Sequence, residues 1–159
     1  MVKALVCGSF DPITNGHLSL IARAARIFDH VVVGIFSNSQ KRYMFSAEER
    51  ADMVREACAS ANLDNVTVDC CSGMVAHYVR DNGIDVIVKG ARNTVDFEYE
   101  RTLDFGNKEV YEGAETVLLI SDPKLGQISS TIVREFLKYG EDVSGLVPES
   151  VLKRLREKG

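Results

Sequence analysis

The segment KALVCGSFDPITNGH, residues 3–17, decides the fold of this chain. It opens with an apolar run that ends at Gly8, a pattern typical of a buried β-strand. A loop with turn-forming residues follows, and apolar residues then recur at helical spacing at Leu20, Ile21, Ala24, Ala25 and Phe28. A strand, a loop and a helix in this order begin a β–α–β unit.

The same alternation continues along the whole chain. Apolar runs predict further strands at residues 31–36, 66–71, 85–89 and 116–120. Helical patterns separate them and end the chain, beginning after Ser46, at Met74, near Val95, after Ser129 and at Pro148. Five strands joined by helices indicate a doubly wound α/β sandwich around a five-stranded parallel sheet, with right-handed crossovers. We find no linker or internal repeat and predict a single domain over residues 1–159.

The composition limits the classes of function. Of 159 residues, 45% are apolar and 26% charged, as in globular proteins, and the net charge of −4 argues against a nucleic-acid partner. No apolar run approaches the ~20 residues that cross a bilayer, so we expect no membrane partner. Residues 1–7 lack the features of a signal peptide, and the spacing of Cys7, Cys58, Cys70 and Cys71 matches no zinc or redox motif. We therefore expect reduced thiols and a cytoplasmic location.

The loop after the first strand is the first candidate for ligand binding, because doubly wound sheets bind ligands at the carboxyl ends of their strands. Gly8 and Gly16 permit close backbone approach, and Ser9 and Thr14 supply hydroxyls. His17 lies at the start of the helix, where unpaired N–H groups attract phosphate. A plain turn followed by a histidine in the first helical turn explains these residues equally well. The loop is neither a dinucleotide fingerprint nor a P-loop.

Basic residues follow two other predicted strands. Lys89 at the end of the predicted strand 85–89 and Arg92 in the loop after it flank a glycine, and there Arg92 can grip a phosphate with two N–H groups and Lys89 acts as a point charge. Lys41 follows residues 31–36, although a Lys-Arg pair there is often simply solvated. Cations gathered at one edge of an acidic protein indicate an anionic substrate.

The segment GQISST, residues 126–131, precedes a predicted helix. Three successive hydroxyls, Ser129 to Thr131, exceed what helix capping needs and suit a polyanion, with Arg134 one turn further along. Capping alone is the alternative. The acidic stretch 96–100 compensates a helix dipole, and only Glu100 invites a functional role. No metal-ligand cluster or Ser-His-Asp triad competes for the site.

Taken together, these motifs resemble the nucleotidyltransferase superfamily. Residues 8–17 are similar to its (Thr/His)-x-Gly-His signature, and residues 128–131 are similar to its second signature. Residues 45–50, 89–92 and 96–100 look like one branch, the bacterial phosphopantetheine adenylyltransferases. The resemblance implies a Rossmann-like fold and adenylyl transfer from ATP to 4′-phosphopantetheine, which gives dephospho-coenzyme A and pyrophosphate. It also implies Mg²⁺ held mainly through the ATP phosphates, a homohexamer, and feedback inhibition by coenzyme A.

The resemblance also assigns roles by position, with His17 and Arg92 as catalytic residues. The ATP contacts that it implies are Ser9, Phe10, His17, Gly90, Ala91, Arg92, Glu100, Leu125, Gly126, Gln127, Ile128, Ser129, Ser130 and Thr131. The phosphopantetheine contacts that it implies are Ser9, Lys41, Met74 and Lys89. Two residues depart from the usual pattern: Ser9 replaces threonine and keeps the hydroxyl, whereas Lys89 replaces arginine and loses bidentate contact.

The acceptor phosphate is already an anion and needs no general base, so we expect catalysis by positioning and electrostatic stabilisation. His17 and Arg92 would neutralise charge on the α-phosphate, and residues 129–131 would hold the departing pyrophosphate. One alternative is adenylyl or cytidylyl transfer to another acceptor such as nicotinate mononucleotide. Those branches usually carry histidine at position 14 and lack the block at 97–100. Another alternative is a non-catalytic nucleotide-binding module.

Overall fold

The computed structural model describes residues 1–159 and contains the five predicted strands and the helices between them. The strands are β1 (Lys3–Gly8), β2 (His30–Phe36), β3 (Val66–Cys71), β4 (Val86–Ala91) and β5 (Thr116–Ile120). The helices are α1 (Asn15–Ile27), α2 (Ala47–Ser60), α3 (Val75–Asp81), α4 (Thr94–Val110), α5 (Ser130–Lys138) and α6 (Glu149–Lys158).

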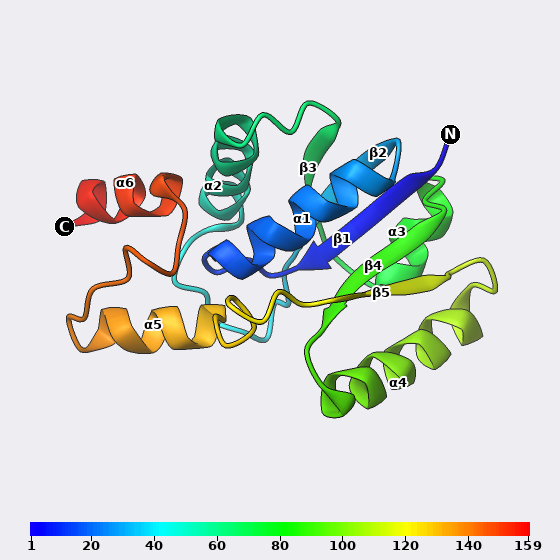
Figure 1. Ribbon diagram of the computed structural model, residues 1–159. Coiled ribbons are helices and arrows are strands. Elements are labelled where there is room, and N and C mark those ends of the chain that lie inside the picture. Colours follow the sequence, from blue (N-terminus) through cyan, green and yellow to red (C-terminus); the bar gives the residue numbers. More distant parts are fainter.

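All five strands are parallel, in the order β3-β2-β1-β4-β5. The chain builds one half of the sheet outward from β1 and then returns to the other side of β1 to build the second half. The strand order therefore reverses between β1 and β4, where a doubly wound sheet opens a crevice for ligands. Figure 1 shows the carboxyl ends of the strands directed toward α5 and α6. The predicted fold class is confirmed.

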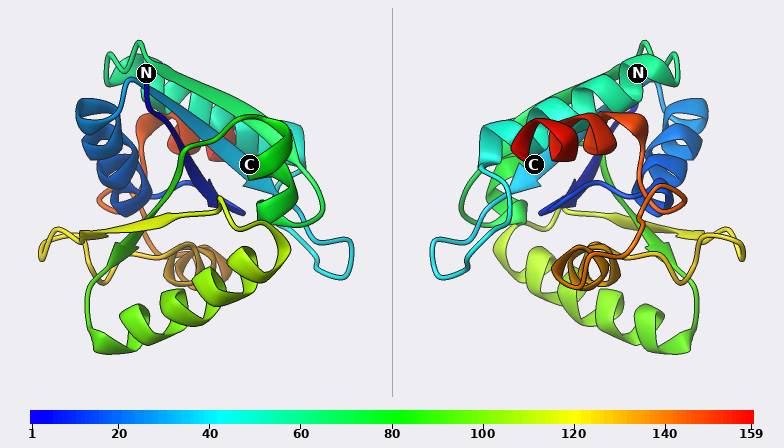
Figure 2. Two further views of the ribbon diagram at one scale, coloured as in Figure 1. Left: turned by 90° about the vertical axis from the view of Figure 1, so that its right-hand side faces the viewer. Right: turned by 90° about the vertical axis from the view of Figure 1, so that its left-hand side faces the viewer.

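Helices cover both faces of the sheet, as the near-continuous apolar strands require. The larger core cluster, of 21 buried residues, joins one sheet face to α1 and α2 and includes residues from α5 and the start of α6. The smaller cluster, of 6 buried residues, joins the opposite face to α3. Figure 2 shows these layers in two side views. Val86 and Val88 face the larger cluster, whereas Leu5 and Ile87 face the smaller one.

Strand β4 ends two residues later than predicted, and this changes the placement of two candidate residues. We expected Gly90 and Ala91 in a loop, but with Lys89 they pair with residues 118–120 of β5 and extend the strand. The loop prediction was wrong here because pairing with a neighbouring strand extends β4 through a glycine that looked like a strand end. Since side chains alternate along a strand, Lys89 points to the face with α3 and α4, and Gly90 faces α1.

Helix α4 lies along β4 and β5 but buries none of its 17 residues. Its exposed apolar side chains, together with one from β5, are Val95, Phe97, Tyr99, Leu103, Phe105, Val110 and Ile120. We call these seven residues the α4 surface. No helix in the structure is both long and apolar enough to span a membrane.

Candidate active site

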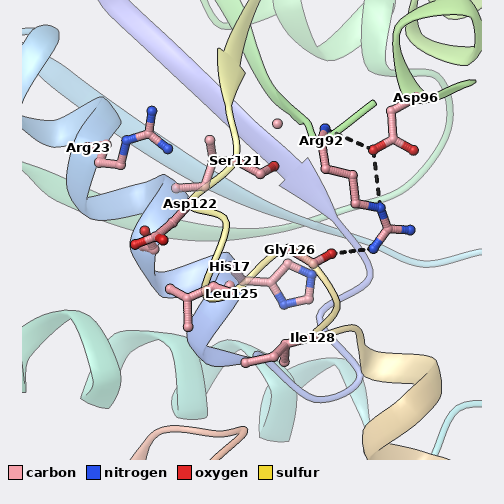
Figure 3. A pocket seen from close by; sticks show the side chains of 13 residues that line it. His17, Arg23, Arg92, Asp96, Ser121, Asp122, Leu125, Gly126 and Ile128 are labelled. Atoms are coloured by element: carbon pink, nitrogen blue, oxygen red, sulfur yellow. Dashed lines mark hydrogen bonds and ion pairs between the residues drawn. The ribbon is translucent and has the colours of Figure 1, made fainter. Parts of the chain in front are cut away.

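A pocket of about 210 Å³ lies at the carboxyl ends of β4 and β5, beside the start of α1. The loop after β5 forms its other wall, as Figure 3 shows. It brings together six predicted site residues: His17, Gly90, Arg92, Leu125, Gly126 and Ile128. It also contains seven residues that were not among the predicted site residues: Gly16, Ser19, Leu20, Arg23, Asp96, Ser121 and Asp122.

The ring of His17 is held in one orientation by the start of its own helix. Thr14 is the N-cap of α1, and the backbone N–H of Thr14 donates to Nδ1 of His17 over 3.0 Å. In return the backbone N–H of His17 donates to Oγ1 of Thr14, which completes a capping box. Glutamate or glutamine usually fills the third helical position of such a box. Here an imidazole does so, and the capping bond fixes the direction of its other nitrogen.

The protonation state of His17 follows from the same contacts. Burial lowers the pKa of this imidazole to about 4, so the free protein carries a neutral ring at pH 7. Because Nδ1 accepts the Thr14 N–H, the ring proton resides on Nε2. His17 therefore offers a neutral N–H donor. The sequence predicted that His17 neutralises charge on the α-phosphate. A neutral imidazole donates a hydrogen bond but carries no charge, so the positive charge of the pocket comes from arginine.

Phe10 supports the imidazole from the side. Its ring meets His17 edge to face, with centroids 5.0 Å apart and planes at 62°. Phe10 is buried and has a backbone φ of 49°, in the left-handed region that non-glycine residues rarely adopt. Such strain costs on the order of 1–3 kcal/mol and occurs often at functional sites. Phe10, predicted as an ATP contact, lies beside the imidazole of His17 and outside the set of residues that line the pocket.

Arg92 bridges two walls of the pocket. Its Nη1 donates to the carbonyl oxygen of Gly126, and its Nε lies 3.4 Å from Oδ2 of Asp96. The same carboxylate accepts the backbone N–H of Arg92 over 3.1 Å. Figure 3 shows the guanidinium and the His17 imidazole on the same side of the pocket. These contacts use only part of the five N–H donors of Arg92, and the rest can bind an anion.

Two glycines allow the walls of the pocket to approach each other. A Cβ at Gly90 would lie 3.3 Å from Oγ of Ser121, and a Cβ at Gly16 would lie 3.5 Å from two carbonyl oxygens of the loop after β5. A larger side chain at Gly90 would therefore enter the space between α1 and the ends of β4 and β5. The absence of a side chain there keeps the pocket open.

Each hydroxyl of the 129–131 run has a partner within the protein. Ser129 caps α5 by accepting the N–H of Ile132. Ser130 donates over 2.7 Å to the carbonyl oxygen of Pro12, and Thr131 accepts from Arg134. The run thus joins α5 to the loop after β1 as well as capping the helix. Gln127 and Ser129 line a neighbouring hollow that shares Arg92 and Ile128 with the main pocket.

The residues predicted to contact the acceptor lie at the same edge of the sheet but outside this pocket. Lys41 lines a separate hollow of about 610 Å³ beyond β2, and the Met74 side chain is exposed at the start of α3. Lys89 points to the α4 side, where its Nζ lies 3.5 Å from the carboxylate of Glu100. Ser9 is exposed directly after β1. His17 and Arg92 therefore share one pocket, whereas Lys41 and Lys89 flank it.

The pocket residues that sequence reasoning missed had readable signals. Leu20 and Arg23 follow His17 by three and six residues, which places them near one face of α1. Ser121 and Asp122 come directly after β5, at the carboxyl end of a strand, where doubly wound sheets bind ligands. The ATP contacts predicted in this loop began only at Leu125. Asp96 lies in the first turn of α4, four residues after Arg92, and its carboxylate accepts the backbone N–H of Arg92, so its signal was the i,i+4 spacing at the start of a helix.

The pocket itself offers few ligands for a metal ion such as Mg²⁺. No group of three or more His, Cys, Asp or Glu side chains is arranged to hold a metal ion. Asp96 is engaged by Arg92, and Asp122 accepts the N–H of Lys124. The oxygens that Mg²⁺ prefers would then come largely from phosphates and water, as is common for this ion.

Comparisons with known proteins identify the family of this chain. The cytidylyltransferase-like family model matches residues 5–136. Phosphopantetheine adenylyltransferases from Frankia casuarinae and Dictyoglomus turgidum are 44% and 42% identical, each over 99% of this chain and 98% of the relative. A solved structure titled as a putative nicotinate-nucleotide adenylyltransferase from Vibrio parahaemolyticus superposes with a TM-score of 0.72. At 20% identity over 99% of this chain and 94% of its own, that structure supports the fold alone. By sequence similarity over almost its whole length, this chain belongs to the phosphopantetheine adenylyltransferase family of cytidylyltransferase-like proteins.

Proposed function

We propose that this protein transfers the adenylyl group of ATP to 4′-phosphopantetheine, which gives dephospho-coenzyme A and pyrophosphate in coenzyme A biosynthesis. One observation carries the proposal most directly. A neutral imidazole N–H and a guanidinium lie in one pocket at the switch point, in a chain whose relatives bear this enzyme's name. The arrangement offers hydrogen-bond donors and a cation to an anion, and the free imidazole has too low a pKa to act as a base near pH 7.

The chemistry requires alignment more than proton transfer. An oxygen of the acceptor phosphate attacks the α-phosphorus of ATP, and the bond from that phosphorus to the bridging oxygen of the β-phosphate breaks. The electron pair leaves with pyrophosphate, and no proton needs to move in this step. The barrier comes mainly from repulsion between two anions and from the entropy of alignment, which preorganised donors reduce.

The proposed roles of the residues follow from their geometry. His17 donates Nε2–H to a nonbridging oxygen of the α-phosphate, and its direction is fixed by the capping bond to Thr14. Arg92 places positive charge beside the same phosphate while Gly126 and Asp96 hold its guanidinium. Leu125 to Thr131 and the start of α5 would hold the outer phosphates. Mg²⁺ would arrive bound to the nucleotide and reduce the charge of those phosphates.

The acceptor would approach from the flanks of this pocket. The predicted acceptor contacts lie at the carboxyl ends of the strands, on both sides of the switch point: Ser9, Lys41, Met74 and Lys89. Lys89 shares its charge with Glu100, so a bound phosphate would compete with that carboxylate for the ammonium group. We therefore propose that acceptor binding loosens the Lys89–Glu100 pair and frees Glu100 for the nucleotide contact that the family resemblance implies.

A panel of donors and acceptors tests the reaction. The purified protein would receive ATP or CTP with phosphopantetheine or nicotinate mononucleotide, and pyrophosphate release would be measured. We expect rapid release only with ATP and phosphopantetheine. Preferred use of nicotinate mononucleotide, preferred use of CTP, or ATP binding without turnover would each refute the proposed reaction.

The α4 surface supports a proposal about assembly. A well-formed helix that exposes Val95, Phe105 and other apolar side chains carries a patch of the kind that marks protein interfaces. We propose that further copies of this chain cover it in a homohexamer. Light scattering should give six times the 17.6 kDa of one chain, and Phe105→Asp should lower that mass. An unchanged mass in the variant would contradict the role of this surface.

Two further proposals concern regulation and location. Coenzyme A carries the pantetheine arm of the acceptor, so we propose that it inhibits by occupying the acceptor site. Inhibition that is competitive with phosphopantetheine would support this, and purely noncompetitive inhibition would oppose it.

All four cysteines are free, in keeping with a reducing cytoplasm, which localisation of the tagged protein would test.

A further inference from the structure

The side chain of Arg50 in α2 is 2% exposed and has no carboxylate within the 4.0 Å of an ion pair. Burying a guanidinium in this way is costly unless its donors are satisfied. Hydrogen bonds and one aromatic ring take the place of a counter-ion. Nothing in the proposed chemistry uses this arginine, so its retention in the core needs another explanation.

The contacts of Arg50 join three segments near the proposed acceptor site. Nη1 donates over 2.8 Å to the carbonyl oxygen of Ser9, directly after β1. Nη2 donates over 2.8 Å to Oγ of Ser37, directly after β2, and Nε donates over 3.1 Å to the carbonyl oxygen of Phe45. The ring of Tyr43 lies 4.1 Å from its guanidinium carbon.

Asp11 anchors the same loop at its far end. Its carboxylate is 2% exposed and accepts the backbone N–H groups of Met44 and Phe45 over 2.8 and 3.0 Å. The hydroxyl of Tyr43 accepts the N–H of Asn38 and closes the base of the loop. Residues 38–43 therefore extend between two anchors, both fixed to the loop after β1, and Lys41 lies on this extension.

We infer that Arg50 is a positioning residue for the acceptor, which holds Ser9 and the Lys41 loop at the spacing that the acceptor phosphate requires. The inference rests on the proposed reaction. Only the fork of a guanidinium reaches all three acceptors, because an ammonium group is a compact point donor on a flexible stem. None of the contacts of Arg50 reaches His17, Arg92 or the loop after β5. Of the residues that Arg50 holds, only Ser9 is also implied as an ATP contact, so loss of Arg50 should weaken acceptor binding far more than ATP binding.

A second arginine, Arg134, is expected to affect ATP binding more than acceptor binding. Arg134 of α5 donates from Nη1 to the carbonyl oxygen of Asp11 and from Nη2 to Oγ1 of Thr131. It ties the same β1 loop to the start of the helix that would hold the outer phosphates. Arg134→Met should therefore raise the dissociation constant for ATP more than that for the acceptor. The two arginines give a matched pair with opposite expected effects.

Calorimetry with phosphopantetheine and with ATP, combined with steady-state kinetics, tests the inference. Loss of hydrogen bonds to a charged group predicts that Arg50→Met raises the acceptor dissociation constant about 10- to 100-fold, with ATP affinity within about threefold of wild type. Arg50→Lys keeps the charge and loses the fork, so it should not restore acceptor binding. Arg55→Met, at a solvent-exposed arginine of the same helix, should leave both constants unchanged.

Three results would overturn the inference. The first is wild-type acceptor binding in Arg50→Lys. The second is an equal rise of the dissociation constants for ATP and the acceptor in Arg50→Met. The third is a lower melting temperature of Arg50→Met with both dissociation constants unchanged. If Arg50→Met fails to fold, Ser37→Ala removes a single contact and should still raise the acceptor dissociation constant severalfold. A wild-type protein that binds no phosphopantetheine would refute the proposed reaction itself, and that result is distinct from the other three.

Discussion

Replacement of His17 should separate catalysis from helix capping. In His17→Gln the glutamine takes the usual third position of a capping box and can still accept the Thr14 N–H. It cannot place a rigid N–H donor where Nε2 of the imidazole lies. His17→Ala removes both functions. The two variants thus share the catalytic defect and differ in the cap.

The magnitudes follow from the contacts. Loss of one preorganised donor to a developing charge costs about 10²–10³ in kcat, or about 3–4 kcal/mol. Loss of a capping interaction costs about 1 kcal/mol, which lowers Tm by about 2–4 °C in a domain of this size. Both variants should therefore lose about 10²–10³ in kcat, with a much smaller change in the KM for ATP. Only His17→Ala should also lose the stability of the cap.

The assay is pyrophosphate release with both substrates saturating, alongside thermal unfolding of each variant followed by circular dichroism. A kcat near that of wild type in His17→Gln would show that the imidazole N–H does not stabilise the transition state. A loss of activity in proportion to the loss of stability would show that His17 acts only through the fold. Either result would refute the mechanism derived from the pocket.

Three further predictions concern pH and the walls of the pocket. The low pKa of His17, about 4 against an ordinary 6.5, means that the unfolded chain binds a proton between pH 6.5 and 4 that the folded chain does not. The free energy of unfolding should therefore fall as pH decreases through this window, and denaturant titrations should show a shallower fall in His17→Gln; equal slopes would contradict the neutral ring. Gly90→Ala places a methyl group 3.3 Å from Oγ of Ser121. The KM for ATP should therefore rise about tenfold at unchanged Tm, which corresponds to about 1.4 kcal/mol of lost binding. An unchanged KM would show that ATP does not occupy the space beside Gly90. Arg92→Lys should lower kcat/KM about 10- to 100-fold, because a lysine cannot hold the Gly126 carbonyl and a phosphate in one plane; full activity would show that charge alone suffices.

The sheet and its helices were predictable because strand residues buried on both faces leave an uninterrupted apolar pattern. Strands β3 and β5 begin and end at the residues expected from sequence. The end of β4 was misjudged because Gly90 ends the apolar pattern, while the pairing that extends the strand comes from β5, remote in sequence. Local patterns do not record such pairing.

The candidate site was predictable in part for a similar reason. His17 and Arg92 follow strands β1 and β4, so topology alone brings them to one edge. The neutral state of His17 depends on burial by residues distant in the chain, and no spacing rule reports it. The sequence placed Arg50 only at the end of the 45–50 motif, and the folded structure shows that it reaches the ends of two strands.

The alternation of Lys89 and Gly90 along β4 has a consequence for substitutions. Neighbouring residues of one strand place a proposed acceptor contact in one layer of the molecule and leave open space for the proposed nucleotide pocket in the other. A substitution at Lys89 can then change the charge offered to a phosphorylated acceptor while the open space at Gly90 is kept.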